Sequence, residues 1–217
     1  MWRGEVEDEA KLHRLPHNNM PKLFLLRHLQ SQWNKENRFT GWTDVPLSQE
    51  GIESAKAVAG KLAGLKIDII YTSPLIRNKE TVSLILNNLN KENLPVTINK
   101  ALDERNYGRL QGLNKDEVKK QYGEEQVKLW RRSWDKAPPG GESLKDVFER
   151  AVPFFKKYIE PDLKGRKNVL VVASHNSLRA LIKYIEKIPD QDIINTEMAL
   201  GELRVYEFDN NCYTKSI

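Results

Sequence analysis

Leu23-Phe24-Leu25-Leu26-Arg27-His28 is an apolar run that passes directly into an arginine and a histidine. The run has the composition of a strand buried on both faces, and we predict a strand over Lys22–Arg27. A buried strand seldom ends in such residues, because a charge there must be desolvated or paired. The planar donors of Arg27 suit a phosphate, and a ring nitrogen of His28 can attack one. The alternative interpretation is a strand end with a surface ion pair.

Further apolar strands alternate with helical patterns along the rest of the chain. We expect strands at Ile67–Thr72, Val96–Ile98, Asn168–Ala173 and Leu203–Phe208. We expect helices over residues 48–64, 74–87, 115–134 with an interruption near Gly123, 143–159 with a kink at Pro153, and 178–187. This alternation predicts an α/β fold, a three-layer sandwich in which helices cover both faces of a mostly parallel sheet.

The composition limits the possible partners and surroundings. The 217 residues suit one domain over residues 22–217, preceded by an irregular extension over residues 1–21. A net charge of +5 favours anionic ligands, but the lysines are scattered, so we expect no nucleic acid. No apolar stretch approaches the ~18 residues that span a bilayer, so we expect no membrane partner. The acidic segment Met1–Ala10 resembles no leader and Cys212 is the lone cysteine, which indicates a cytoplasmic protein.

Three strands are predicted to end in reactive side chains, at Arg27-His28, Thr72-Ser73 and Ser174-His175. Ligands of open α/β sheets bind at the carboxyl ends of the strands, so these residues should converge. Of the four histidines, His13 and His17 lie in the N-terminal extension. Chemistry that needs two core histidines must therefore use His28 and His175.

Taken together, the motifs resemble those of the cofactor-dependent phosphoglycerate mutases, in the histidine phosphatase superfamily. The resemblance runs from about Lys22 to near the end of the chain, and the loop over residues 138–144 resembles that of the short, fungal-type forms. The motifs are Leu26-Arg27-His28, the run from Ser31 to Trp42, Tyr71-Thr72-Ser73-Pro74-Leu75 with Arg77, Glu104 to Gly108, Gln111 to Lys115, Trp130-Arg131-Arg132, Asn176 to Leu181 and Val205-Tyr206-Glu207-Phe208.

The resemblance implies a glycolytic enzyme that interconverts 3-phosphoglycerate and 2-phosphoglycerate through a phosphohistidine on His28. It implies 2,3-bisphosphoglycerate as the phosphoryl donor, small phosphorylated sugar acids as partners and no metal. Glu104 would be the general acid and base, and its surroundings should then raise its pKa. The implied catalytic residues are His28, Glu104, His175, Arg27 and Arg77. The implied substrate-binding residues are Asn34, Thr40, Gly41, Tyr107, Lys115, Arg131, Arg132 and Asn176.

The chain departs from the family pattern at several places, and two of them concern the histidines of the site. The family has Gly-Glu after the Arg-His pair, whereas this chain has Leu29 and Gln30, and Leu29 restricts the backbone more than glycine does. The family has Ala-His-Gly-Asn where this chain has Ala173-Ser174-His175-Asn176. We expect a one-residue shift in the strand or its loop to bring His175 into the pocket.

Two other functions remain possible at this point. A histidine phosphatase of small phosphorylated metabolites would keep His28, but it has less need of Lys115, Arg131 and Arg132. A catalytically weakened pseudoenzyme with a binding role is supported by Leu29 and Ser174. The sequence leaves open whether the protein is a monomer or a homo-oligomer.

Overall fold

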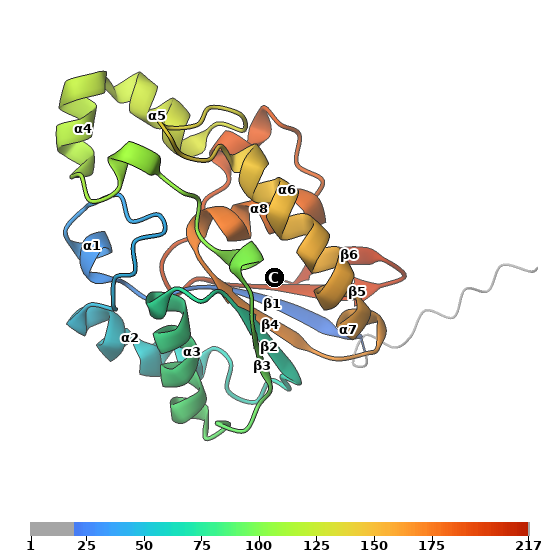
Figure 1. Ribbon diagram of the computed structural model, residues 1–217. Coiled ribbons are helices and arrows are strands. Elements are labelled where there is room, and N and C mark those ends of the chain that lie inside the picture. The colour runs from blue at the N-terminus through green and yellow to red at the C-terminus, as the bar shows by residue number, and fades with distance from the viewer. Residues whose placement is uncertain (1–19, 217) are drawn as a thin grey trace, which may run out of the picture.

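A six-stranded sheet forms the centre of the computed structural model, which describes residues 20–216 (Figure 1). The strands lie in the order β3-β2-β4-β1-β5-β6. Their bounds are β1 Lys22–Arg27, β2 Ile69–Thr72, β3 Val96–Ile98, β4 Val169–Ala173, β5 Leu203–Asp209 and β6 Cys212–Ser216. The first four in this order pair in parallel, and β5 and β6 add an antiparallel edge. The expected extension falls mostly on residues 1–19, outside the described residues.

Helices cover both faces of the sheet, which confirms the predicted three-layer α/β architecture (Figure 1). Helices α2 (Gln49–Gly60) and α3 (Ile76–Leu89) cover one face. Helices α6 (Leu144–Phe154), α7 (Glu160–Lys164) and α8 (His175–Ile185) cover the other. Side chains alternate along a strand, so β1 supplies a core residue to each face in turn. That alternation explains why its apolar run has no polar member.

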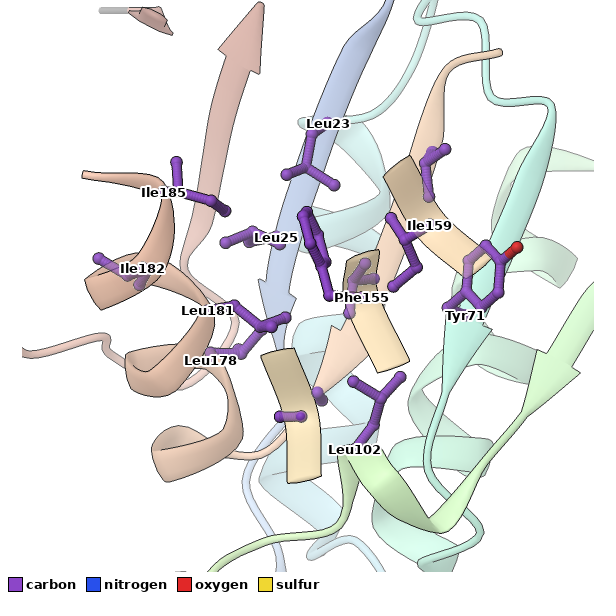
Figure 2. Close-up of a cluster of buried hydrophobic side chains, with 14 of the residues drawn as sticks. Leu23, Leu25, Tyr71, Leu102, Phe155, Ile159, Leu178, Leu181, Ile182 and Ile185 are labelled. Carbon is purple, nitrogen blue, oxygen red and sulfur yellow. The ribbon is translucent and has the colours of Figure 1, made fainter. Parts of the chain in front are cut away.

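Phe155 lies at the centre of the core on the α8 face. Figure 2 shows its ring between Leu23 and Leu25 of β1 and Leu178 and Leu181 of α8. The ring is fully buried. It begins a π-helical turn, Phe155–Ile159, directly after Pro153 in α6. Proline removes one backbone donor, so the expected irregularity in this helix appears as a wider turn.

Helices α4 (Lys115–Tyr122) and α5 (Glu124–Arg132) stand above the carboxyl ends of the strands (Figure 1). They meet at Gly123, which confirms the predicted interruption. Gly123 has a φ of +85°, a conformation that costs glycine little. Val118, Val127 and Trp130 bury the inner face of the pair in a small core of its own. This packing fixes the side chains that the two helices direct at the strand ends.

Several element bounds differ from those predicted. Helix α8 begins at His175, three residues before the predicted Leu178, because Ser174 is its extended N-cap. Strand β6 was missed because its side chains are mostly polar and exposed. It follows a two-residue turn at Asn210-Asn211, both with positive φ, which is a typical hairpin signal. The short helix α1 (Gln32–Lys35) was also missed. No helix within residues 20–216 has the length and apolarity needed to cross a membrane.

Candidate active site

A cationic pocket lies at the carboxyl ends of β1 and β4, roofed by α4 and α5. All predicted site residues except Asn176 line it, and Arg38 and Phe39 line it as well. The residues are Arg27, His28, Asn34, Arg38, Phe39, Thr40, Gly41, Arg77, Glu104, Tyr107, Lys115, Arg131, Arg132 and His175. Asn176 lies directly behind it, bonded to Glu104 and Tyr107.

The His28 ring is buried and held by one hydrogen bond. Its Nδ1 lies 2.6 Å from the carbonyl oxygen of Leu29, so Nδ1 carries a proton that it donates. A neutral ring then has its lone pair on Nε2. Burial, with Arg77 and Arg27 nearby, holds the pKa of His28 well below its usual value. The ring is therefore neutral at physiological pH and able to act as a nucleophile through Nε2.

Arg27 and Arg77 bring two buried positive charges to this end of the pocket. Arg77 donates to the carbonyl oxygens of Gly41 (2.8 Å) and Thr43 (3.2 Å), which fixes its guanidinium. Arg27 Nη1 donates to the carbonyl of Met198 (2.7 Å). Within residues 20–216, the buried Arg27 Nε and Thr40 Oγ1 have no hydrogen-bond partner. Buried donors are normally satisfied, so these two atoms indicate where an anion would bind.

Leu29 does not disturb the nucleophile, contrary to the concern raised by the sequence. Its φ is not positive, so glycine is not required at this position. Its side chain is 1% exposed and packs into the core with α2 and α3, away from the pocket. Its N–H donates to Thr81 Oγ1 (3.1 Å), and its carbonyl oxygen accepts the His28 proton. The residue after the nucleophile is therefore a core residue.

Leu29→Ala should lower the free energy of unfolding by about 2–5 kcal/mol, as expected for a cavity in a packed core. Chemical denaturation followed by circular dichroism measures this change. Ile52→Ala is the matched control, because Ile52 on α2 is 42% exposed and its truncation should cost less than about 0.5 kcal/mol. Equal effects in the two variants would contradict a core position for Leu29.

Glu104 lies buried in the pocket wall with three donors on one oxygen. Its Oε1 accepts from the backbone N–H of Arg105 (2.7 Å), the backbone N–H of Asn176 (3.1 Å) and the Asn176 side chain (2.9 Å). Among the described residues, these bonds leave Oε2 available for proton transfer. The Trp42 indole (2.6 Å) and Arg150 (2.9 Å) donate to the Glu104 carbonyl and fix its main chain.

The pKa of Glu104 is lowered, so the expectation of a raised value is wrong. Burial is the largest influence and raises this pKa, but His175, the Arg105 N–H, Arg77 and the Asn176 side chain together outweigh it. Glu104 is therefore ionised and ready to accept a proton. An anionic group that binds beside Arg77 would offset its positive charge and raise the pKa of Glu104. A residue that later gives the proton back needs such a rise.

Lys115, Arg131 and Arg132 bring further positive charge to the pocket from α4 and α5. Burial and the neighbouring Arg131 lower the pKa of Lys115 to about 8. Tyr107 also lines the pocket, and its hydroxyl accepts from Arg105 (3.1 Å) and Asn176 (3.2 Å). The pocket therefore combines cations from the strand ends and α3 with cations from α4 and α5, and Glu104 is a buried carboxylate among them.

His175 reaches the pocket from the first turn of α8, with no shift in the strand. The pairing of β1 with β4 is regular up to Arg27 and Ala173, so the expected register change does not occur. Ser174 directs its hydroxyl toward Asn78, whose amide donates to it (3.2 Å). His175 lines the pocket instead, 7% exposed. The early start of α8 thus provides what a strand shift was expected to provide.

Asn34 and Gly41 are held by local structure. The Asn34 side-chain oxygen accepts from the backbone N–H and the hydroxyl of Ser31, which caps α1. Gly41 has a φ of +56°, and a Cβ there would lie 2.1 Å from Gln111 Oε1. Gln111 in turn accepts from the Trp42 N–H (2.8 Å). The loop therefore needs glycine at position 41.

Besides Arg38 and Phe39, sequence reasoning gave no role to Glu197 and Arg179, which contact residues of the pocket. Glu197 contacts both His175 and Arg132. Arg179 is fully buried and donates to the carbonyl oxygens of Thr196, Arg132 and Ile193. Arg179 lies within the motif Asn176 to Leu181 but was given no role. Glu197 lies in no motif, because its partners His175 and Arg132 are distant in sequence. No group of three or more metal-ligating side chains is found in the part of the chain that the structure describes.

Comparison with known proteins matches residues 23–216 to the family model of the histidine phosphatase superfamily (branch 1). A 2,3-bisphosphoglycerate-dependent phosphoglycerate mutase of Cytophaga hutchinsonii is 46% identical over 198 residues, 91% of this chain and 92% of the relative. The enzyme of the same name from Chlamydia muridarum is 42% identical over 221 residues, 91% of this chain and 98% of the relative.

Solved structures share the fold. A mycobacterial glucosyl-3-phosphoglycerate phosphatase superposes with a TM-score of 0.81 at 26% identity, covering 91% of this chain and 98% of that chain. The protein YhfR of Bacillus stearothermophilus superposes with a TM-score of 0.80 at 25% identity, covering 91% and 96%.

Proposed function

Because this chain belongs to the histidine phosphatase superfamily (branch 1), we propose that it is a 2,3-bisphosphoglycerate-dependent phosphoglycerate mutase. The reaction is the interconversion of 3-phosphoglycerate and 2-phosphoglycerate. The observation that carries the proposal is the neutral, buried His28 near Arg77 and Arg27, in a pocket that Lys115, Arg131 and Arg132 also line. Relatives of that name cover nearly the whole chain at more than 40% identity.

The chemistry begins with His28. Its Nε2 forms a bond to phosphorus while the bond from phosphorus to the donor oxygen breaks, and Arg27 and Arg77 offset the charge on the transferring oxygens. The bound phosphorylated substrate raises the pKa of Glu104, so that Glu104 takes up a proton from solvent and gives it to the leaving hydroxyl oxygen. In the second half, Glu104 removes a proton from the other hydroxyl, and that oxygen displaces His28 from phosphorus. One phosphate region therefore serves both hydroxyls of the sugar acid.

The residues present fit a ligand with two phosphates. Arg27 Nε and Thr40 Oγ1, buried and unpartnered among the described residues, are available to bind one anionic group. Lys115, Arg131 and Arg132 lie where the carboxylate and the second phosphate would be held. When bound, 2,3-bisphosphoglycerate supplies the phosphoryl group that His28 takes up.

A phosphatase is the second candidate function, because the solved structures with the same fold include a phosphatase. The mutase is favoured by Lys115, Arg131 and Arg132, which also line the pocket. These three cations can hold a sugar acid while first one and then the other of its hydroxyls reacts at His28. The pseudoenzyme loses its two supports, because Leu29 packs in the core and His175 lies in the pocket.

One experiment separates these functions. The protein is incubated with 2,3-bisphosphoglycerate, and acid-labile phosphate on His28 is measured beside 3-phosphoglycerate turnover. Label together with isomerisation supports the mutase. Label with released phosphate and no isomerisation supports the phosphatase, and no label at saturating ligand would exclude both enzymes.

Lys115 should make the reaction sensitive to alkaline pH. The lysine is charged below its pKa of about 8, so kcat/KM should fall as the pH rises through that value and the charge is lost. The pH profile of kcat/KM for 3-phosphoglycerate measures this. In Lys115→Arg the charge persists, so the decline should move to higher pH. A profile that is the same in both proteins would assign the decline to another group.

We also propose that residues 22–217 act as a single catalytic domain and that the protein works in the cytoplasm. The family model covers nearly all of this range. The substrates are metabolites of glycolysis, which supports the cytoplasmic assignment.

A further inference from the structure

Glu197 links two pocket residues, His175 and Arg132, through its carboxylate. Its Oε2 lies 3.0 Å from His175 Nε2, and its Oε1 lies 2.6 Å from Arg132 Nε. His175 begins α8 and Arg132 ends α5, and both residues line the pocket. Each carboxylate oxygen therefore serves a different pocket residue.

The main chain around Glu197 is held on both sides. Arg179 Nε donates to the carbonyl of Thr196 (2.9 Å), Arg27 Nη1 donates to that of Met198 (2.7 Å), and Arg204 donates to that of Glu197. The Met198 side chain is fully buried. The segment before β5 thus has little freedom, although the Glu197 side chain is half exposed.

These contacts distinguish Glu197 from an ordinary surface ion pair, which contributes little to stability. Burial would raise the pKa of Glu197, but His175 and Arg132 bring it down to about 2, so the group stays ionised. Its partner His175 is nearly buried. An ionised acceptor on Nε2 selects the tautomer of His175 that carries its proton there.

We propose that Glu197 is a positioning residue that fixes the tautomer of His175 and the orientation of the Arg132 guanidinium. With Nε2 of His175 and Nε of Arg132 both engaged, the described part of the chain leaves His175 Nδ1 and the Arg132 Nη atoms for other partners. The assignment of these partners to a phosphorylated sugar acid rests on the proposed function, whereas the positioning itself does not.

The charge of Glu197 also bears on proton uptake by His175. Burial is the main reason that the pKa of His175 falls to about 4. Arg27 on β1 and Arg179 on α8 lower it further, whereas Glu197 and Glu104 raise it. A phosphoryl group bound beside the ring would add negative charge and favour the imidazolium. Removing the Glu197 charge should make that protonation harder.

Glu197→Gln tests the positioning, because glutamine keeps the length but has one acceptor oxygen for two donors. We expect kcat to fall about 10- to 100-fold, as for other residues that orient a catalytic group, with a smaller change in KM. Glu149→Gln is the matched control, since Glu149 lies on α6 in an exposed pair with Lys145. It should leave both constants unchanged.

Imidazole ¹⁵N NMR of the whole protein supplies a readout that needs no activity, with the His175 signals assigned by their loss in His175→Gln. The wild type should show His175 protonated at Nε2, and Glu197→Gln should show a mixed tautomer. An unchanged tautomer would overturn the proposal. So would a lower KM at unchanged kcat, which would make Glu197 a competitor for the substrate on Arg132. If the wild type fails to isomerise phosphoglycerate, the proposed function fails while the NMR result still decides the positioning.

Discussion

Replacing His28 with alanine is expected to lower phosphoglycerate turnover by at least about 10⁴-fold, because a covalent nucleophile has no substitute in the reaction. Turnover of 3-phosphoglycerate and acid-labile phosphate after incubation with 2,3-bisphosphoglycerate are the two measurements. Both should be lost together.

The loss in His28→Ala should come from chemistry and not from unfolding. The ring makes a single protein hydrogen bond, to the carbonyl of Leu29. Circular dichroism and thermal unfolding check that the fold persists, and binding of inorganic phosphate checks that Arg27 and Arg77 remain in place. A folded His28→Ala protein that still accumulates acid-labile phosphate would place the nucleophile elsewhere.

Glu104→Gln is expected to slow isomerisation by about 10²- to 10⁴-fold, the usual contribution of a general acid and base. Glutamine has the same shape, and its side-chain oxygen can still accept from the Arg105 N–H and from Asn176. The proton transfer to and from the substrate hydroxyls is what this variant loses. His28 itself is unchanged, so it should still become labelled, only more slowly.

Rapid-quench labelling beside steady-state turnover separates the two roles of the site. In Glu104→Gln, label on His28 should accumulate while isomerisation stays slow, whereas His28→Ala should give neither. Glu149→Gln again provides a control at an exposed glutamate. Undiminished isomerisation in Glu104→Gln would remove this residue from proton transfer and require another group that titrates in the pocket.

Local sequence patterns were sufficient for most of the fold. The uninterrupted apolar runs of β1 and β4 predicted strands buried on both faces, because helices cover a parallel sheet on each side. Ser48 and Gly123 marked a helix start and a helix break through the backbone chemistry of single residues. The start of α8 was misjudged, since the apolar periodicity begins after the serine that caps the helix.

The sequence by itself determined that Arg27 and His28 end a central strand, because apolar composition and strand periodicity are properties of neighbouring residues. Only the tertiary structure decided that Leu29 packs in the core, that the pKa of Glu104 falls and that Glu197 supports His175. Glu104 receives two of its three donors from Asn176, 72 positions away, and His175 meets Glu197 across 22. Electrostatic and hydrogen-bond energies depend on distances in space, which spacing along the chain does not specify.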